Sequence, residues 1–208
     1  MKTLLTTALF ALLSQLAIAQ GWSPYTSSDD NFRILAPGDF DITEIEFPSE
    51  YGAVLPARVY SYETGGNQYA VTVVDYTNAR AIHAARADRN EAELNLYWEI
   101  DVRASVDYAA TNLRNRGGTV NYDAYHYIDR IEGHQLQITN DDATRTYAAI
   151  YLHDSRLYII EATVVPRSPP PVMFQQSMEF LNDAGERIRY GNFADAIKVR
   201  DAEVAVSY

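Results

Sequence analysis

Few residues in this chain of 208 could act as catalytic nucleophiles. The chain contains no cysteine, and it contains no Gly-x-Ser-x-Gly elbow of the kind on which many hydrolases present their serine. His153, Asp154 and Ser155 are consecutive in a segment with the composition of a tight turn. Side chains of consecutive turn residues diverge, so these three cannot line up as nucleophile, base and orienting acid. The sequence therefore predicts no catalytic residue.

Metal binding would require histidines that the fold brings together. The four histidines, at positions 83, 126, 134 and 153, form no H-E-x-x-H motif and no pair four residues apart. His126 and His134 fall on two segments expected to be adjacent strands, so their rings could lie close together and bind a metal or sense pH. The alternative is two half-buried, hydrogen-bonded histidines. We expect no dedicated metal site and no cofactor.

A basic cluster is the next candidate, in a chain whose formal net charge is −11. Its members are Arg80, His83, Arg86 and Arg89. In a helical segment, two or three of these cations could converge on the carboxylate or phosphate of a small anionic ligand. The alternative is that they form ion pairs with acidic residues nearby in the sequence, which are common and weak on protein surfaces.

Sixteen tyrosines form an unusually large group for a chain of this length. Tyrosine is favoured in strands, and it is also favoured at binding surfaces, where a rigid ring with a polar tip loses little entropy when it is fixed. Most of these rings are expected to pack across strands. A sheet edge or groove that binds a partner through tyrosines is the alternative.

The segment from Ala143 to Val165 must position these candidates, because it predicts two buried strands that meet at Asp154-Ser155. Its β-branched and aromatic residues favour strand, and the residues between the two arms favour a turn. Both arms are apolar on both faces, whereas a strand with one solvated face alternates apolar and polar residues. The sequence therefore predicts an α+β chain whose antiparallel sheet is covered by helices on both faces, a three-layer α/β/α sandwich.

The remaining elements follow from periodicity and turn residues. Asn90 and Glu93 make a capping box before an apolar stripe that ends at Gly117-Gly118, which predicts one long helix. A polar arm precedes the first strand, and a turn is expected at residues 131–133. The expected strands are 32–36, 41–47, 54–63, 68–76, 119–130 and 134–139, with a second helix at 172–181 and an edge strand at 187–190.

The first 19 residues predict a secretory signal peptide, because a short apolar run follows Lys2 and ends in Ala17-Ile18-Ala19. We therefore expect a periplasmic or extracellular protein with no transmembrane segment, and with no lipid anchor because no cysteine follows the cleavage site. Residues 20–185 are expected to form one domain and 186–208 a C-terminal tail. The negative charge disfavours nucleic acid as a partner.

Hydrophobic patterns of this chain resemble those of PsbP-like proteins, an exported bacterial and thylakoid-lumen family. The residues that carry the resemblance are NFRILAPG at 31–38, QYAVTVVDY at 68–76, Gly133, RTYAAIYLHDSRLYIIEATV at 145–164 and Phe180-Leu181. The Asn182-Asp183 ending and the tail to Tyr208 depart from that pattern. The resemblance implies an α/β/α sandwich and an accessory role, and it carries over no functional residue.

The function expected from these observations is that of an exported, non-catalytic binding or accessory protein with a protein or small anionic ligand as its partner. The alternative is a periplasmic hydrolase or ligand-binding enzyme that uses a dispersed carboxylate pair, for which the 28 acidic residues offer many combinations.

Asp29-Asp30 and Asp141-Asp142 lack the spacing and the glycine of an EF-hand loop, and are interpreted as turn residues.

Overall fold

The computed structural model describes residues 21–87 and 96–200 of the chain. Its main feature is a seven-stranded antiparallel sheet in the order β3-β4-β5-β9-β8-β7-β6. The strands are β3 (Asp41–Pro48), β4 (Val54–Thr64), β5 (Asn67–Asp75), β6 (Thr119–Ile128), β7 (Ile131–Thr139), β8 (Arg145–His153) and β9 (Arg156–Val164). The expected α+β class with a mostly antiparallel sheet is confirmed.

The central hairpin, β8 and β9, lies inside this sheet, between β7 and β5. Asp154 and Ser155 form its turn with φ values of 46° and 56°, as a two-residue turn that matches the twist of the strands requires. Most residues of both strands are buried. The predicted turn and the predicted burial are thus confirmed.

The turn between β6 and β7 differs from the expectation. It is formed by Asp129 and Arg130, which have positive φ values, and Gly133 lies inside β7. A Cβ atom at Gly133 would overlap the carbonyl oxygen of Ile150 and the ring of Tyr151. Gly133 is therefore needed for a close cross-strand approach, and the sequence signal of a turn was misleading.

Two helices cover one face of the large sheet. They are α2 (Ala79–Ala85) and α3 (Tyr97–Arg114), and α3 buries Trp98, Val102, Ala109 and Leu113 against strands β4, β5, β7, β8 and β9. The apolar stripe predicted for the long helix thus faces the core. The Asn90–Glu93 capping box lies outside the described residues.

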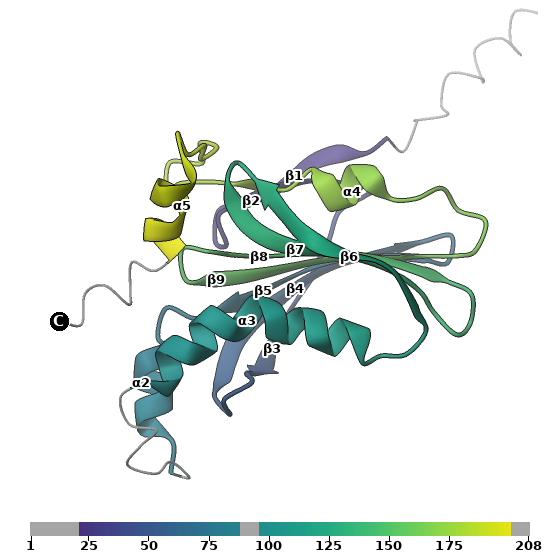
Figure 1. Ribbon diagram of the computed structural model, residues 1–208. Helices are drawn as coiled ribbons and strands as arrows, with labels where there is room; N and C mark the ends of the chain where they lie inside the picture. Colours follow the sequence, from purple (N-terminus) through teal and green to yellow (C-terminus); the bar gives the residue numbers. More distant parts are fainter. Residues whose placement is uncertain (1–20, 88–95, 201–208) are drawn as a thin grey trace, which may run out of the picture.

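A second layer of mixed structure covers the opposite face (Figure 1). It contains a small sheet in the order β1-β2-β10, made of β1 (Ser23–Ser27), β2 (Phe32–Ala36) and β10 (Glu179–Phe180), together with the short helix α4 (Val172–Gln176). Phe32, Phe174 and Phe180 are completely buried there. This face is therefore covered by strands as well as by helix.

The N-terminal and C-terminal segments differ from the sequence-based expectations. The segment read as a polar arm contains β1, because it pairs along its whole length with β2. The predicted helix at 172–181 ends at Gln176, because Glu179 and Phe180 pair with Arg33 and Phe32 of β2. The predicted edge strand at 187–190 is reduced to one bridge between Leu181 and Arg187.

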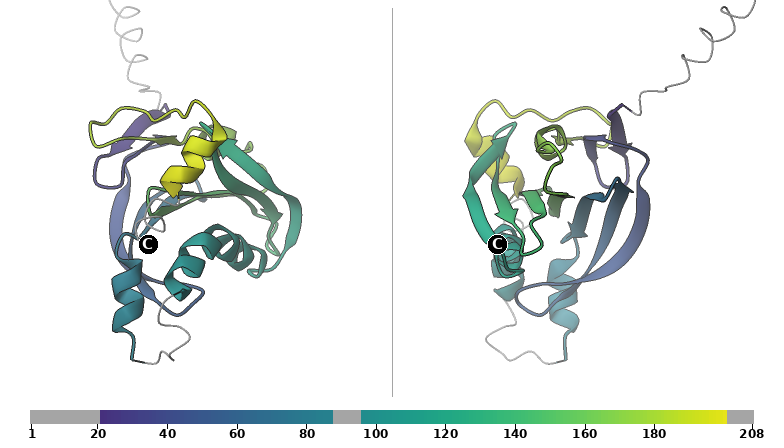
Figure 2. Two further views of the ribbon diagram at one scale, coloured as in Figure 1. Left: turned by 60° about the vertical axis from the view of Figure 1, so that its left-hand side comes forward. Right: turned by 90° about the vertical axis from the view of Figure 1, so that its right-hand side faces the viewer.

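Helix α5 (Phe193–Arg200) follows in the C-terminal segment and lies beside the β6–β7 hairpin (Figure 2). The segment before it is held by ion pairs from Arg187 to Asp129 and Glu179. Tyr190 and Phe193 contact the rings of His153 and Tyr127. The C-terminal segment thus packs on the part of the sheet formed by β7 and β8.

Candidate functional site

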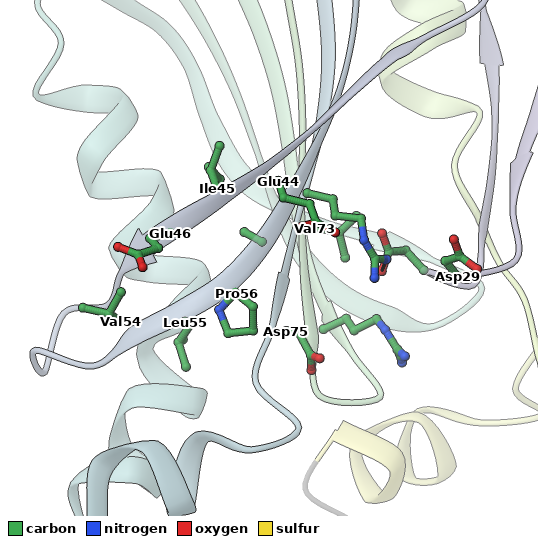
Figure 3. A pocket seen from close by; sticks show the side chains of 13 residues that line it. Asp29, Glu44, Ile45, Glu46, Val54, Leu55, Pro56, Val73 and Asp75 are labelled. Carbon is green, nitrogen blue, oxygen red and sulfur yellow. Dashed lines mark hydrogen bonds and ion pairs between the residues drawn. The ribbon is translucent and has the colours of Figure 1, made fainter. Parts of the chain in front are cut away.

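A groove of about 550 Å³ lies at the β3 side of the molecule (Figure 3). Figure 3 shows Glu44 and Glu46 on β3, Asp75 at the end of β5, and Asp29 in the turn between β1 and β2. The groove is lined by five acidic residues, two arginines and six apolar residues: Asp29, Asp30, Glu44, Glu46, Asp75, Arg58, Arg156, Ile45, Val54, Leu55, Pro56, Ala57 and Val73. We call it the acidic groove.

Strand register places the charged residues of this groove. Glu44 lies directly opposite Arg58, and Asp75 lies directly opposite Arg156. Residues directly opposite each other in an antiparallel pair share one face of the sheet, so each of these pairs combines an acid with a base on one face. Glu46 lies opposite Pro56, which carries no charge. The groove therefore keeps an excess of negative charge.

Asp30 fixes one wall of the acidic groove. Its Oδ1 accepts a hydrogen bond from Arg58 Nη1 at 2.7 Å, and its Oδ2 accepts one from the Tyr60 hydroxyl at 2.6 Å. Its carbonyl oxygen accepts a bond from the Tyr158 hydroxyl at 2.9 Å, and its N–H donates to Ser27 Oγ at 3.2 Å. The β1–β2 turn is thus anchored to strands β4 and β9, so this wall is preformed.

Burial and hydrogen bonding also fix the protonation of the tyrosines in this network. Burial, followed by the bond to Asp30, raises the pKa of Tyr60 to about 12. Burial raises the pKa of Tyr158 far above its ordinary value. Both hydroxyl groups are therefore hydrogen-bond donors over the physiological pH range, and Asp30 is an acceptor for both residues.

Of the basic cluster, the structure describes Arg80, His83 and Arg86, and each has a contact of its own. The guanidinium of Arg80 lies 5.9 Å from the centre of the Trp98 ring, whereas Arg86 Nη1 donates to the carbonyl oxygen of Tyr51. Arg80 lies inside helix α2, which ends at Ala85. Arg86 follows the helix with an extended backbone, so its side chain does not continue the helical spacing from Arg80. Arg89 lies outside the described residues. Binding of an anion by Arg80, Arg86 and Arg89 stays a prediction.

His83, the remaining member of that cluster, has a structural role. Its Nε2 lies 2.8 Å from Asp101 Oδ2, and both side chains are almost completely buried between α2 and α3. The role of Asp101, which lies among the buried residues of the predicted helix, was not predicted from the sequence. This buried pair links helix α2 to helix α3. Substitution of either residue would leave the other buried without its hydrogen-bond partner, which destabilises the fold.

The expected proximity of His126 and His134 is wrong. His126 lies opposite Gly133, and His134 lies opposite Tyr125. Because consecutive residues of a strand point to opposite faces, the two imidazole rings lie on opposite faces of the sheet. In the described ranges, no group of three or more His, Asp or Glu side chains is placed to hold a metal ion.

Each of these histidines has its own partner. His126 Nδ1 is hydrogen-bonded to the Tyr151 hydroxyl at 2.7 Å, and burial lowers the pKa of His126. His134 pairs with Asp123, which also accepts two hydrogen bonds from Arg114 at 2.7 and 2.9 Å. The Arg114 guanidinium, with a smaller contribution from His134, lowers the pKa of Asp123 to about 2.

Exposed tyrosines gather on β6, the strand at the other edge of the large sheet. Tyr122, Tyr125 and Tyr127 are 43%, 68% and 48% exposed. The ring of Tyr125 packs edge-on against His134, and that of Tyr127 against Phe193. The β6 edge is therefore a second candidate surface, and binding of a partner through its tyrosines stays a prediction.

The acidic groove was not predicted from the sequence. Asp29-Asp30 was interpreted only as part of a turn, yet Asp30 organises one wall. The alternation of Glu44 and Glu46 with Ile45 and Phe47 was the available signal, because it puts both acids on one face of an exposed strand. Asp75 and Arg156 are brought together by β5–β9 pairing, which no local pattern indicates.

Comparison of the sequence with protein families and with individual curated proteins finds no match. Among solved structures, the chain is similar to the solution structure of cyanobacterial PsbP (CyanoP) from Synechocystis sp. PCC 6803. The identity is 11%, the TM-score is 0.44, and the match covers 80% of this chain and 95% of that chain. A likeness at this level concerns the fold alone. Within the described residues, no helix has the length and apolar character needed to cross a membrane.

Proposed function

We propose that this chain is an exported, non-catalytic accessory protein that binds a partner through the acidic groove. The observation that carries the proposal is a preformed groove of about 550 Å³ with an excess of carboxylates. A cavity of this size lies in the range of ligand and peptide sites. The Asp30 network supports the proposal, because a wall held by four hydrogen bonds loses little entropy when a partner binds.

The rest of the chain serves in this proposal as a scaffold. We infer a three-layer arrangement related to the α/β/α sandwich, with the large sheet in the middle and the domain extending over residues 20–185. Export rests on the signal-like pattern of the first 19 residues. N-terminal sequencing of the protein from culture fractions tests this part, with a mature start at Gln20 expected; a start at Met1 in the cytoplasm would contradict it.

The alternative of a hydrolase with a dispersed carboxylate pair needs a general acid whose pKa is raised. The carboxyl groups of Asp123 and Asp142 have a lowered pKa, the opposite of what a general acid requires. Arg114 lowers the first, and hydrogen bonds from Thr144 lower the second. No observation on the described residues therefore favours the hydrolase.

Site-specific photo-crosslinking in the native host tests the binding site. The photoreactive residue p-benzoylphenylalanine would replace Glu44 in the groove, Tyr122 on the β6 edge, or exposed Asp107 on α3 as a control. A discrete crosslinked species is expected from position 44 and not from position 107. Crosslinks from position 122 alone, or from none of the positions, would contradict the proposal.

A further inference from the structure

The outer edge of β3 is open to another strand. In the ranges that the structure describes, β3 pairs with β4 and with no other strand. It is eight residues long, and seven of these residues are exposed. Figure 2 shows β3 and β4 at the side of the molecule opposite the β6–β7 hairpin. An unpaired strand edge offers a row of main-chain N–H and C=O groups to an extended peptide.

The side chains of β3 specify what such a peptide should carry. Glu44 and Glu46 share one face of the strand, and Ile45 and Phe47 share the other. Ile45 is 39% exposed, and Phe47 packs against Tyr108 of α3. A neighbouring strand would place alternate side chains beside the two acids and the intervening side chains beside the two apolar residues. Basic and apolar residues in alternation satisfy both faces.

The charge of the groove favours the same partner. Asp29 adds negative charge beyond Glu44 and Glu46, while Asp75 lies opposite Arg156. The guanidinium of Arg58 is already engaged by Asp30 at 2.7 Å. A formal net charge of −11 attracts basic ligands over a long range. A second copy of this chain is disfavoured on the same strand, because antiparallel β3–β3 pairing would bring carboxylates together.

We propose that β3 binds an extended peptide segment of alternating basic and apolar residues as an additional strand of the large sheet, with its basic side chains in the acidic groove. This inference rests on the proposed function and names the chemistry of the partner. Main-chain hydrogen bonds to β3 supply part of the affinity, and the ion pairs with Glu44 and Glu46 supply the selectivity.

The test uses the purified protein and a fluorescein-labelled peptide, acetyl-Thr-Lys-Val-Lys-Val-Lys-Thr-amide, in a fluorescence anisotropy titration at low salt. We expect saturable binding that weakens as salt rises. Double substitution Glu44→Gln and Glu46→Gln should weaken binding about tenfold, since two ion pairs at the exposed strand edge are lost together. The matched control, Asp107→Asn with Asp141→Asn, removes two exposed acids that do not line the groove and should leave binding unchanged.

Backbone methylation separates strand addition from simple charge attraction. Two peptides would carry N-methyl groups on alternate residues, one in each of the two possible registers. Because only every second N–H of an added strand points to its neighbour, one peptide should lose binding and the other should keep it. Equal binding of both methylated peptides, or no binding of the parent peptide, would overturn the inference.

The outcome also distinguishes this inference from the proposed function. If position 44 crosslinks a partner in the host while the peptide does not bind, the groove is a binding site for a different partner. If the peptide binds as expected but position 44 gives no crosslink in the host, the strand edge has the inferred chemistry and the cellular function has to be sought elsewhere.

Discussion

The two edges of the large sheet are protected in different ways. At β6, the C-terminal segment lies over part of the hairpin, with Tyr127 against Phe193 and Arg187 paired to Asp129. At β3, exposed acids alternate with apolar residues beside a groove, and in the described ranges no strand continues the sheet. In the described ranges the outer edge of β6, like that of β3, pairs with no further strand, and the two edges differ in the side chains that line them. The β3 edge differs from the β6 edge in lying beside a groove with an excess of carboxylates, which suits it to a basic partner strand.

The largest expected effect tests how tightly the β6 side is packed. Gly133→Ala should lower the free energy of unfolding by about 3 kcal/mol, because the added Cβ has to displace the Ile150 carbonyl and the Tyr151 ring. Urea denaturation measures this loss. Gly191→Ala is the control, since no atom lies within 4 Å of a Cβ built there and its φ is not positive. A loss below 1 kcal/mol for Gly133→Ala would show that this side is loosely packed.

The contact between His153 and the tail predicts a loss of stability in acid. Burial lowers the pKa of His153 to about 4, from 6.5 for a free side chain. The unfolded chain therefore binds a proton at higher pH, and the stability from this group is complete above pH 6.5 and falls as the pH drops to 4. We expect His153→Gln to reduce the difference in unfolding free energy between pH 7 and pH 4 by about 2 kcal/mol.

Tyr190→Phe is the control for that experiment. It removes the hydroxyl that lies 2.8 Å from His153 Nε2 but leaves the imidazole buried. The acid-dependent loss should therefore persist in this variant. If His153→Gln retains the full pH dependence of the wild type, the histidine does not report on closure of the tail.

Asp123 tests the electrostatic contribution to the β6 edge. Its pKa of about 2 lies below the ordinary 3.8, so its stabilisation is present above pH 3.8 and is lost as the pH falls through 2. The side chain is 32% exposed, and solvent screening reduces the effect. We expect Asp123→Asn to cost about 1 kcal/mol at pH 7 in urea denaturation. The control substitution at exposed Asp141, Asp141→Asn, should leave the unfolding free energy almost unchanged. An equal loss of unfolding free energy in both variants would mean that the effect comes from the change in net charge and not from the contacts of Asp123.

The smallest expected effect is at the β3 edge. Glu44→Gln together with Glu46→Gln should change the free energy of unfolding by less than about 0.5 kcal/mol, since exposed substitutions outside a network have small effects. Urea denaturation measures this as well. A loss above 1 kcal/mol would mean that these acids stabilise the fold, and the contrast between the two edges would then need another explanation.

Local patterns predicted those parts of the fold that depend on neighbouring residues. The turn at Asp154-Ser155 and the buried stripe of α3 followed from composition and periodicity. Gly133 was misread, because a glycine signal does not distinguish a turn from a close approach by Tyr151 of another strand. The helix predicted at 172–181 was too long, because pairing of Phe180 with Phe32 overrides local helix preference.

The candidate site also has parts that the sequence predicts and parts that only the tertiary structure shows. The alternation of Glu44 and Glu46 with apolar residues was present in the sequence, because side chains on a strand alternate between its faces. The separation of His126 from His134 required the register of β6 with β7, which the sequence left open. Neither the partners of Asp30 nor the meeting of Asp75 with Arg156 follows from local sequence.

By itself, the sequence determined the kind of strands and helices, the acidity of the chain and the absence of cysteine chemistry, since these depend on residue types and on the spacing of near neighbours. Only the tertiary structure decided which strands form the sheet edges, which histidines are apart and where the acids gather around a groove. The reason is that cross-strand register and layer packing join residues far apart in the chain, and a shift of one residue would turn every side chain of a strand to the other face.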